Sequence, residues 1–340
     1  MSSQIASTFQ LINFEDPEDF IAAVKKHDDS YMNFALGALQ DSLGRGRSFG
    51  GGPRTLVAVS RDGQILATVT KVARDFSWII SIPREVIGTL DDSEKAAIIQ
   101  LFVESLPTII DPKSLDKLLG PSDYVDLFLE RWVIHMREHG LNLKLLDPFF
   151  RSKVSYATVA TLPVPNPAFN NYKISLAHTE EDKETLAHFY VQFLSSGPHQ
   201  STLEEARGVI ANAVNSRDVW ICRVGGVVTG YILTGRFTLR TVAIKNVFVT
   251  PSHRRKGIAE ALVRAVTRYY LGADPRGFEG GPDAGPSDGK KEEVCLNVAT
   301  EEAERLYKRT GFLFGAKDPL SGKEGWYASC WRGVEEAVVS

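Results

Sequence analysis

The residues from Val247 to Leu262, VFVTPSHRRKGIAEAL, restrict the possible folds of this chain more than any other segment. A β-rich run ends at Thr250-Pro251, a basic turn follows, and a helical pattern begins directly after it. The small residues Gly257 and Ala259 let an anion approach the backbone, and the positive end of the helix dipole would face that anion. The segment therefore predicts a strand, a turn and a helix with a pyrophosphate site between them.

The overall charge of the chain excludes some classes of partner. The 340 residues carry 39 Lys and Arg against 42 Asp and Glu, a formal net charge of −3. Such a balance gives no general positive field, so we expect no nucleic acid and no membrane among the main partners. The basic turn is then a local site, and the 43% of hydrophobic residues is enough for sizeable cores.

The cysteines and the first residues of the chain indicate the cellular compartment in which the protein is expected. Cys222, Cys295 and Cys330 lie far apart, with no CxxC pair and no histidine spacing suited to zinc, so we expect no metal and a reducing environment. The first residues lack a basic segment followed by an apolar one, and no run reaches the roughly 20 apolar residues that span a bilayer. A cytoplasmic, soluble protein is the expectation.

The second half of the chain alternates strand and helix patterns in a mixed order. Helices are expected at 180–195, 202–214, 256–271 and 301–310; strands are expected at 172–177, 218–224, 227–235, 239–249, 293–299, from Gly311 onward, and at 325–332, where the domain would close. Residues 272–291 are rich in Gly, Pro, Asp and Lys and contain one large apolar residue, Phe278. They predict a flexible, solvated insertion, with a substrate lid as the alternative.

The first half loosely repeats this order. A helical segment at 16–43 precedes strand patterns at 55–60, 64–72 and 76–82, helical patterns at 92–106 and 121–139, and strands in LNLKLLDPFF and YATVATLPV. PVPNPAFNN, at 163–171, holds three prolines and three asparagines and favours neither regular structure. We therefore expect domains at 1–162 and 172–340, joined by a linker at 163–171.

Two motifs of the second half resemble those of the GNAT superfamily of CoA-dependent N-acyltransferases. The first is the turn pattern Q/R-x-x-G-x-G/A, present as Arg254 to Ala259 after a strand and at the start of a helix. The second is A-x-x-L-Y-x-x-x-G-F on the downstream helix, present from Ala303 to Phe312. Both occur in the expected order and context, and the resemblance covers roughly residues 172–335.

This resemblance implies an α+β fold of tandem GNAT-like mixed sheets flanked by helices, the second sheet opened by a V-shaped splay. It also implies an acyl-CoA donor, expected to be acetyl-CoA, and an amine acceptor. The residues that match the cofactor-binding positions are Val247, Phe248, Val249, Arg254, Arg255, Lys256, Gly257, Ile258, Ala259, Thr300, Ala303 and Tyr307. Backbone N–H groups of the turn would bind the pyrophosphate, and the free strand edge at Val247 and Val249 would pair with the pantetheine amides.

The implied reaction is direct attack of the amine on the thioester, with the rate supplied largely by proximity. An N–H near Phe248 or Val249 would stabilise the oxyanion, and Tyr307 matches the tyrosine that protonates the CoA thiolate. Thr300 stands where the family commonly has asparagine, so its contact with the cofactor is open. Strand 239–249 carries no Glu or Asp, and the general base stays unassigned among candidates that include His178, His199 and Asp218. His253 is read as a surface residue.

We interpret the first half as a degenerate copy of the same fold. IPREVIGTLDD, after its third strand, lacks the Q/R-x-x-G-x-G/A spacing, so no cofactor site is expected there. GRGRSFGGG, from Gly44 to Gly52, precedes a strand instead of following one, which disfavours a phosphate loop. The copy would cover the acceptor site or complete the sheet.

Three functions follow in order. The first is an acyl-CoA-dependent N-acyltransferase, an enzyme with an amine as acceptor. The second is a non-catalytic CoA-binding or scaffold protein, which the missing carboxylate base favours. The third is a related reaction of a CoA thioester other than N-acylation. The identity of the acceptor does not follow from the sequence.

Overall fold

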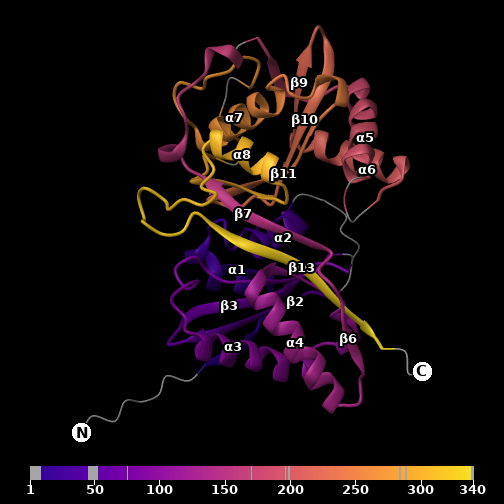
Figure 1. The fold of residues 1–340 in the computed structure, drawn as a ribbon, viewed down its shortest axis with the longest axis vertical. Helices are drawn as coiled ribbons and strands as arrows, with labels where there is room; N and C mark the ends of the chain where they lie inside the picture. The colour runs from indigo at the N-terminus through magenta and orange to yellow at the C-terminus, as the bar shows by residue number, and fades with distance from the viewer. Residues whose placement is uncertain are drawn as a thin grey trace. The chain divides into compact units, whose positions relative to one another are not determined.

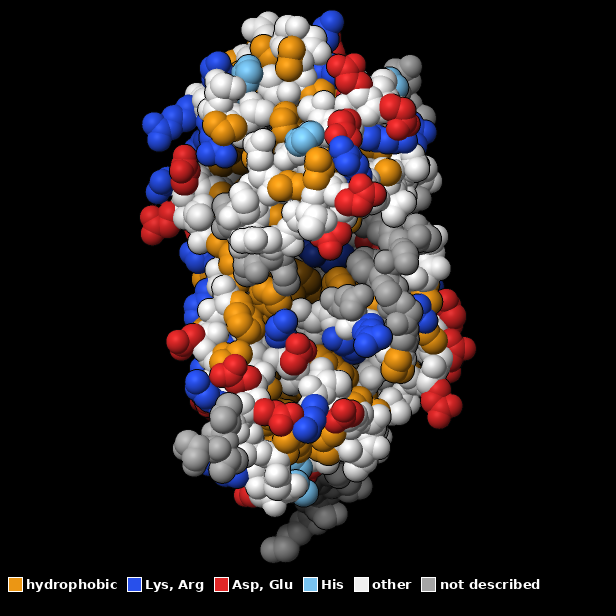
Figure 2. Space-filling model, turned by 90° about the vertical axis from the view of Figure 1, so that its right-hand side faces the viewer, with side chains coloured by type: hydrophobic (Ala, Val, Ile, Leu, Met, Phe, Trp, Pro, Cys, Tyr) orange, Lys and Arg blue, Asp and Glu red, His pale blue; other side chains and the backbone are white. Residues whose placement is uncertain are grey.

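The computed structural model describes residues 9–44, 53–74, 76–169, 171–195, 197, 200–282, 285–287 and 289–337. Of the glycine-rich candidate phosphate loop at 44–52, only Gly44 lies within the described residues. No helix among the described residues is long and apolar enough to cross a membrane. Figure 2 shows Lys and Arg side chains interspersed with Asp and Glu side chains over the face that it presents, as the small net charge predicts.

The chain forms two compact units that are not continuous in sequence. The N-terminal unit holds residues 1–152 together with 328–340, and the C-terminal unit holds residues 153–327. The expected division at 162 and 172 differs from this one in two places. The linker at 163–171 lies within the C-terminal unit, and the last residues of the chain lie within the N-terminal unit.

The sheet of the N-terminal unit runs in the order β1-β2-β3-β4-β5-β13. Its strands are β1 (Gln10–Asn13), β2 (Thr55–Arg61), β3 (Gln64–Lys71), β4 (Trp78–Ser81), β5 (Lys117–Pro121) and β13 (Trp326–Glu336), and a short β6 (Leu143–Leu145) pairs with β13. Helices α1 (Pro17–Val24) and α2 (Asn33–Gly44) cover one face, and α3 (Asp92–Ser105) and α4 (Ser122–Glu138) cover the other. The helical pattern at 16–43 is thus two helices, separated by a short break after His27.

The C-terminal unit repeats this arrangement with the strand order β8-β9-β10-β11-β12-β7. Its strands are β7 (Phe150–Ala157), β8 (Lys173–Leu176), β9 (Val219–Val224), β10 (Val227–Gly235), β11 (Thr241–Val249) and β12 (Glu293–Val298). Figure 1 shows α5 (Glu180–Leu194) and α6 (Leu203–Asn215) on one side of β9 to β11, and α7 (Ile258–Leu271) and α8 (Glu301–Arg309) on the other.

The two units share one topology. Strands β4 and β5 are parallel and are joined through α3, as β11 and β12 are parallel and are joined through α7. A final antiparallel strand follows in each sheet: β13 on β5, and β7 on β12. The fold prediction of tandem mixed sheets flanked by helices is confirmed. The strands that close the two sheets come from unexpected parts of the chain, because β7 follows α4 in sequence but pairs in the C-terminal unit.

Two other expectations about the end of the C-terminal unit need correction. Gly311 to Gly315 was expected to begin a strand, but it forms turns, with positive φ at both glycines. The strand expected at 325–332 exists as β13, yet from Ala328 onward it belongs to the N-terminal unit. Alternation of apolar residues predicts a strand but does not specify its partner, which depends on residues distant in sequence.

The insertion at 272–291 is anchored over its first half instead of being free in solvent. The ring of Phe278 packs edge-on against Trp220, with centroids 6.1 Å apart. The buried guanidinium of Arg268 donates hydrogen bonds to the carbonyls of Pro275 and Arg276, and Arg276 lies over the ring of Tyr269. The one large apolar residue of the segment and the hydrogen bonds of Arg268 together anchor it to the unit.

Candidate functional site

Strands β11 and β12 separate part-way along their length. They pair from Thr241 opposite Glu293 to Ile244 opposite Leu296, and β11 then continues to Val249 with no partner on that edge among the described residues. Its other edge stays paired with β10 as far as Val249 opposite Gly230, with a register shift between Ile244 and Asn246. This bulge and the end of the parallel pairing open the V-shaped splay. The backbone groups of the last residues of β11 are available to an extended ligand.

The turn after β11 is held open by two residues with positive φ. Arg255 has φ of 61° and Gly257 has φ of 83°. Gly257 is the N-cap of α7 and makes no side-chain capping bond. Within the described part of the chain, the backbone N–H groups from Arg255 to Glu260 have no hydrogen-bond partner. These donors and the positive helix end converge on the space beside the turn, an arrangement that suits an anion.

The segment from Pro163 to Tyr172, here called the strap, lies against this turn. A Cβ on Gly257 would come within 3.1 Å of the Phe169 ring. The Tyr172 hydroxyl donates a hydrogen bond to the carbonyl of Lys256, and the Arg264 guanidinium lies 5.5 Å from the centroid of the Phe169 ring. The segment expected to be a linker is thus part of the structure that supports the turn.

A cavity of about 980 Å³ joins the splayed strand, the turn and α8. Its walls come from the end of α5, the end of β11, the turn with the first residues of α7, and one face of α8. The lining residues are Gln192, Phe193, Val247, Phe248, Val249, His253, Arg254, Arg255, Gly257, Ile258, Ala259, Glu260, Glu302, Arg305, Leu306 and Arg309. The volume and the mixture of open N–H groups, cations and apolar walls suit a long anionic ligand.

The sequence of this region matches a known family. Residues 215–313 match the model of the acetyltransferase (GNAT) domain. This segment is a GNAT domain. The match covers β9 to β12 with α7 and α8, so all the elements around the cavity except the end of α5 lie inside it. The fold of this domain is the one that supports transfer of an acyl group from CoA.

Solved structures resemble the chain over nearly its whole length. A GCN5-related N-acetyltransferase from Sphaerobacter thermophilus is similar with a TM-score of 0.50 and 15% identity, over 96% of this chain and 95% of that one. A GCN5-related N-acetyltransferase from Kribbella flavida is similar with a TM-score of 0.48 and 13% identity, over 91% of this chain and 97% of that one. A tandem GNAT protein from the clavulanic acid biosynthesis pathway is similar with a TM-score of 0.45 and 10% identity, over 98% of this chain and 100% of that one. No curated protein matches the chain in sequence.

The GNAT domain brings most of the expected cofactor-binding residues to the cavity. Three come from β11, three from the turn and two from the first turn of α7: Val247, Phe248, Val249, Arg254, Arg255, Gly257, Ile258 and Ala259. Lys256, Thr300, Ala303 and Tyr307 are not among the described residues that line it. Thr300 instead caps α8, where its hydroxyl accepts a hydrogen bond from the N–H of Ala303 at 3.3 Å.

The sequence reasoning missed the face that α8 turns to the cavity. Glu302, Arg305, Leu306 and Arg309 line it, and their spacing of three and four residues places them along one side of the helix. The sequence contains this periodicity, but the motif predicted cofactor contacts only for Ala303 and Tyr307 on this helix. Gln192 and Phe193, from α5, gave no local signal at all.

Tyr307 lies beside this face and packs into the core of the GNAT domain. Its ring contacts Phe312 edge-on at 5.8 Å and Phe314 at 6.5 Å, measured between centroids. Burial raises the pKa of its phenol well above the ordinary value of about 10. Burial thus favours the protonated form of the hydroxyl.

Two of the candidate bases, His178 and Asp218, do not line the cavity. His178 is exposed, with its Nδ1 3.3 Å from the carbonyl oxygen of Leu176, and Asp218 is buried, its carbonyl accepting a hydrogen bond from Thr234. His199 lies outside the described residues. His253 does line the cavity, and its Nδ1 lies 3.0 Å from the hydroxyls of Thr250 and Ser252.

Proposed function

We propose that the GNAT domain transfers an acyl group from an acyl-CoA, with acetyl-CoA as the donor, to an amine. One observation carries the proposal: the unpaired edge of β11 and the open N–H groups of the turn face a single cavity. The first suits the amides of pantetheine, and the second suits a pyrophosphate. Few other ligands present both groups at the two ends of one chain.

Within this proposal the last residues of β11 hold the thioester. The pantetheine amides would pair with the backbone near Val247 and Val249, and an N–H near Phe248 or Val249 would stabilise the oxyanion. The amine attacks the thioester carbonyl directly, the C–S bond breaks, and the electron pair leaves with the sulfur. Holding the two reactants together supplies much of the rate.

Tyr307 is proposed to protonate the departing thiolate. Its raised pKa keeps the proton on the phenol, and Tyr307 follows the lining residue Leu306 on α8, so the proposal requires its hydroxyl to reach the sulfur from beside the cavity wall. The role predicts a requirement for the hydroxyl group but not for the ring.

The N-terminal unit is proposed to carry no cofactor. At the position that corresponds to the turn, α3 begins with a capping box, in which Asp91 accepts from the N–H of Glu94 and Glu94 accepts from the N–H of Asp91. These carboxylates occupy the helix end and would repel a phosphate.

A second candidate is a protein that binds acyl-CoA without transferring the acyl group. The acidic side chains that line the cavity are Glu260 and Glu302, and Glu260 is paired with Arg264 and Arg309. Since β11 carries no carboxylate, no side chain there is placed to deprotonate an incoming ammonium group. Acceptors that are already neutral would not need one.

Acetyl-CoA, a panel of amines and the Tyr307→Phe variant test these candidates together. Thiol release and product mass are measured, with Tyr269→Phe as a control for loss of a buried phenol outside the cavity. We expect turnover by the wild type, a loss of about 100-fold in Tyr307→Phe, and unchanged CoA affinity in both variants. Unchanged turnover would remove the acid role. Binding without release across the panel supports the second candidate, and absence of CoA binding contradicts both.

A further inference from the structure

Helix α8 presents two guanidinium groups to the cavity, and one of them, Arg309, reaches Glu260 at the start of α7. Arg305 and Arg309 are one helical turn apart and both line the cavity. Their side chains are 65% and 58% exposed, so an anion in the cavity can reach them. These two side chains belong to α8, so they are separate from the backbone N–H donors of the turn.

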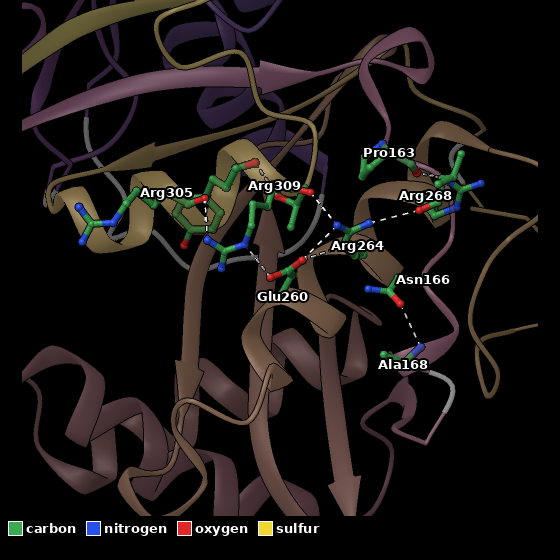
Figure 3. A network of polar contacts seen from close by, with 11 residues as sticks. Pro163, Asn166, Ala168, Glu260, Arg264, Arg268, Arg305 and Arg309 are labelled. Atoms are coloured by element: carbon green, nitrogen blue, oxygen red, sulfur yellow. Dashed lines mark hydrogen bonds and ion pairs between the residues drawn. The ribbon is translucent and has the colours of Figure 1, made fainter.

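Arg309 is oriented by a network that continues to the strap, as Figure 3 shows. Its Nε donates to Glu260 at 3.0 Å, and the other oxygen of Glu260 accepts from Nε and Nη2 of Arg264 at 3.1 and 3.0 Å. Arg264 in turn lies over the ring of Phe169. The Glu260 side chain is only 13% exposed, so the carboxylate that orients Arg309 is largely buried, whereas the guanidinium itself stays open to solvent.

The outer nitrogens of both arginines remain available. Nη1 of Arg309 donates to the carbonyl of Arg305 at 3.2 Å, and its Nη2 has no partner in the described part of the chain. Arg305 makes one exposed ion pair, with Glu301 at 3.6 Å, which contributes little. Nη2 of Arg309 and the weakly paired guanidinium of Arg305 therefore keep donors that can form charge-assisted hydrogen bonds to a phosphate.

The cavity holds more cations than a pyrophosphate at the turn requires. Arg254 and Arg255 belong to the turn, whereas Arg305 and Arg309 belong to α8, and Glu260, in the first turn of α7, is already shared between Arg264 and Arg309. CoA carries a further phosphate on the 3′ oxygen of its ribose, next to the pyrophosphate. That group is a dianion at neutral pH and is the part of the donor left without a partner in the proposed function.

We propose that Arg305 and Arg309 form a second phosphate subsite that binds the ribose 3′-phosphate, so that the domain discriminates CoA from 3′-dephospho-CoA. This rests on the proposed function, because it takes the pyrophosphate to lie at the turn. Glu260 is a positioning residue in this subsite, since it holds Arg309 without touching the ligand. The subsite selects the donor by its nucleotide end, independently of the acyl group.

Calorimetric titration of the full chain with CoA and with 3′-dephospho-CoA tests the subsite. We expect the wild type to bind CoA at least about tenfold more tightly, which corresponds to one good charge-assisted contact. In Arg305→Gln/Arg309→Gln the preference should fall below about threefold, with the affinity for dephospho-CoA nearly unchanged. Lys308→Gln is the matched control, because Lys308 lies on the same helix, pairs with Glu304 and does not line the cavity.

Different results would overturn the 3′-phosphate subsite and the proposed function. Equal binding of the two nucleotides by the wild type, or a preference that survives the double substitution, overturns the 3′-phosphate subsite and leaves the proposed function intact. Failure of the wild type to bind either nucleotide overturns both. If the double variant does not fold, Arg305→Gln alone gives the same test, because it breaks only an exposed ion pair.

Discussion

At the scale of single residues, Gly257 combines two requirements that no other amino acid meets. Its φ of 83° lies in the left-handed region, and a Cβ would meet the Phe169 ring at 3.1 Å. From the sequence, the small size of Gly257 was explained by the close approach of a ligand to the backbone. The structure adds a reason on the protein side, since the strap occupies the space behind the turn.

Gly257→Ala should therefore weaken CoA binding by about tenfold, because the left-handed conformation costs about 1 kcal/mol for Ala and the turn must also move away from Phe169. Titration with CoA measures the loss. Gly226→Ala is the control, since Gly226 has φ of 85° and open space around it, so it should lower stability without changing the affinity. Equal affinities in the two variants would contradict the part assigned to Phe169.

Asp182 gives a prediction about pH. Burial raises the pKa of this carboxyl, but hydrogen bonds from the N–H groups of His178 and Thr179 and from Arg223 outweigh it, so the net pKa is lowered. The charged form is thus favoured by folding, and its contribution is present above the ordinary pKa of about 3.9 and lost as the pH falls further.

Asp182→Asn should lower the free energy of unfolding at pH 7 by about 2 kcal/mol, because Arg223 loses its partner. Between about pH 4 and pH 2 the variant should lose less stability than the wild type does. Urea unfolding across this range measures both effects. Glu180→Gln, an exposed substitution on the same helix, should change neither, and a parallel pH dependence in Asp182→Asn would contradict the assignment.

At the scale of elements, the strap shows where sequence reasoning reached its limit. Local signals predicted the strand, the turn and α7, because Pro251 and Gly257 mark them. Prolines in the strap predicted irregular backbone, and the backbone is irregular, with one short 3-10 helix at Pro167–Phe169. Nothing local predicted that Phe169 and Tyr172 pack on a turn some 84 residues away. Such contacts are a property of the folded unit.

Tyr172→Phe should therefore weaken CoA binding by about threefold to tenfold with little change in the rate at saturation. The substitution keeps the ring stacked beside Phe169 and removes only the hydrogen bond to the Lys256 carbonyl. Steady-state kinetics separates the two effects as a raised KM against an unchanged kcat. A fall in kcat alone would place Tyr172 in the chemistry instead of in the support of the turn.

At the scale of the whole chain, the repeated order of helices and strands was visible in the sequence and its pairing was not. Runs of apolar residues predicted most strands of both halves, whereas β1 and β5, short strands of four and five residues, were missed. β13 was identified as a strand but assigned to the wrong sheet. Its contacts in the N-terminal unit include the buried Cys330 and the Arg332 guanidinium, which donates to Asp126 at 2.7 Å.

Removal of residues 328–340 should therefore unfold the N-terminal unit first. The deletion takes the final strand from β5, and a domain stabilised by about 5–15 kcal/mol rarely survives the loss of a paired, buried strand. Hydrogen exchange should show lost protection in β5 and α4 and retained protection in β9 to β12. Removal of 338–340 alone, beyond β13, is the control and should leave both patterns unchanged. Uniform loss of protection in both units would contradict the prediction.

The exchange of final strands also sets the order of events during synthesis. A ribosome releases β7 directly after the body of the N-terminal unit, yet β13, which that unit requires, emerges only after the whole C-terminal unit. The first half of the chain therefore waits, with the edge of β5 unpaired, until β13 has been synthesised, and the halves cannot mature one after the other as separate domains commonly do. A gene for this protein cannot be divided between its two sheets at any single point.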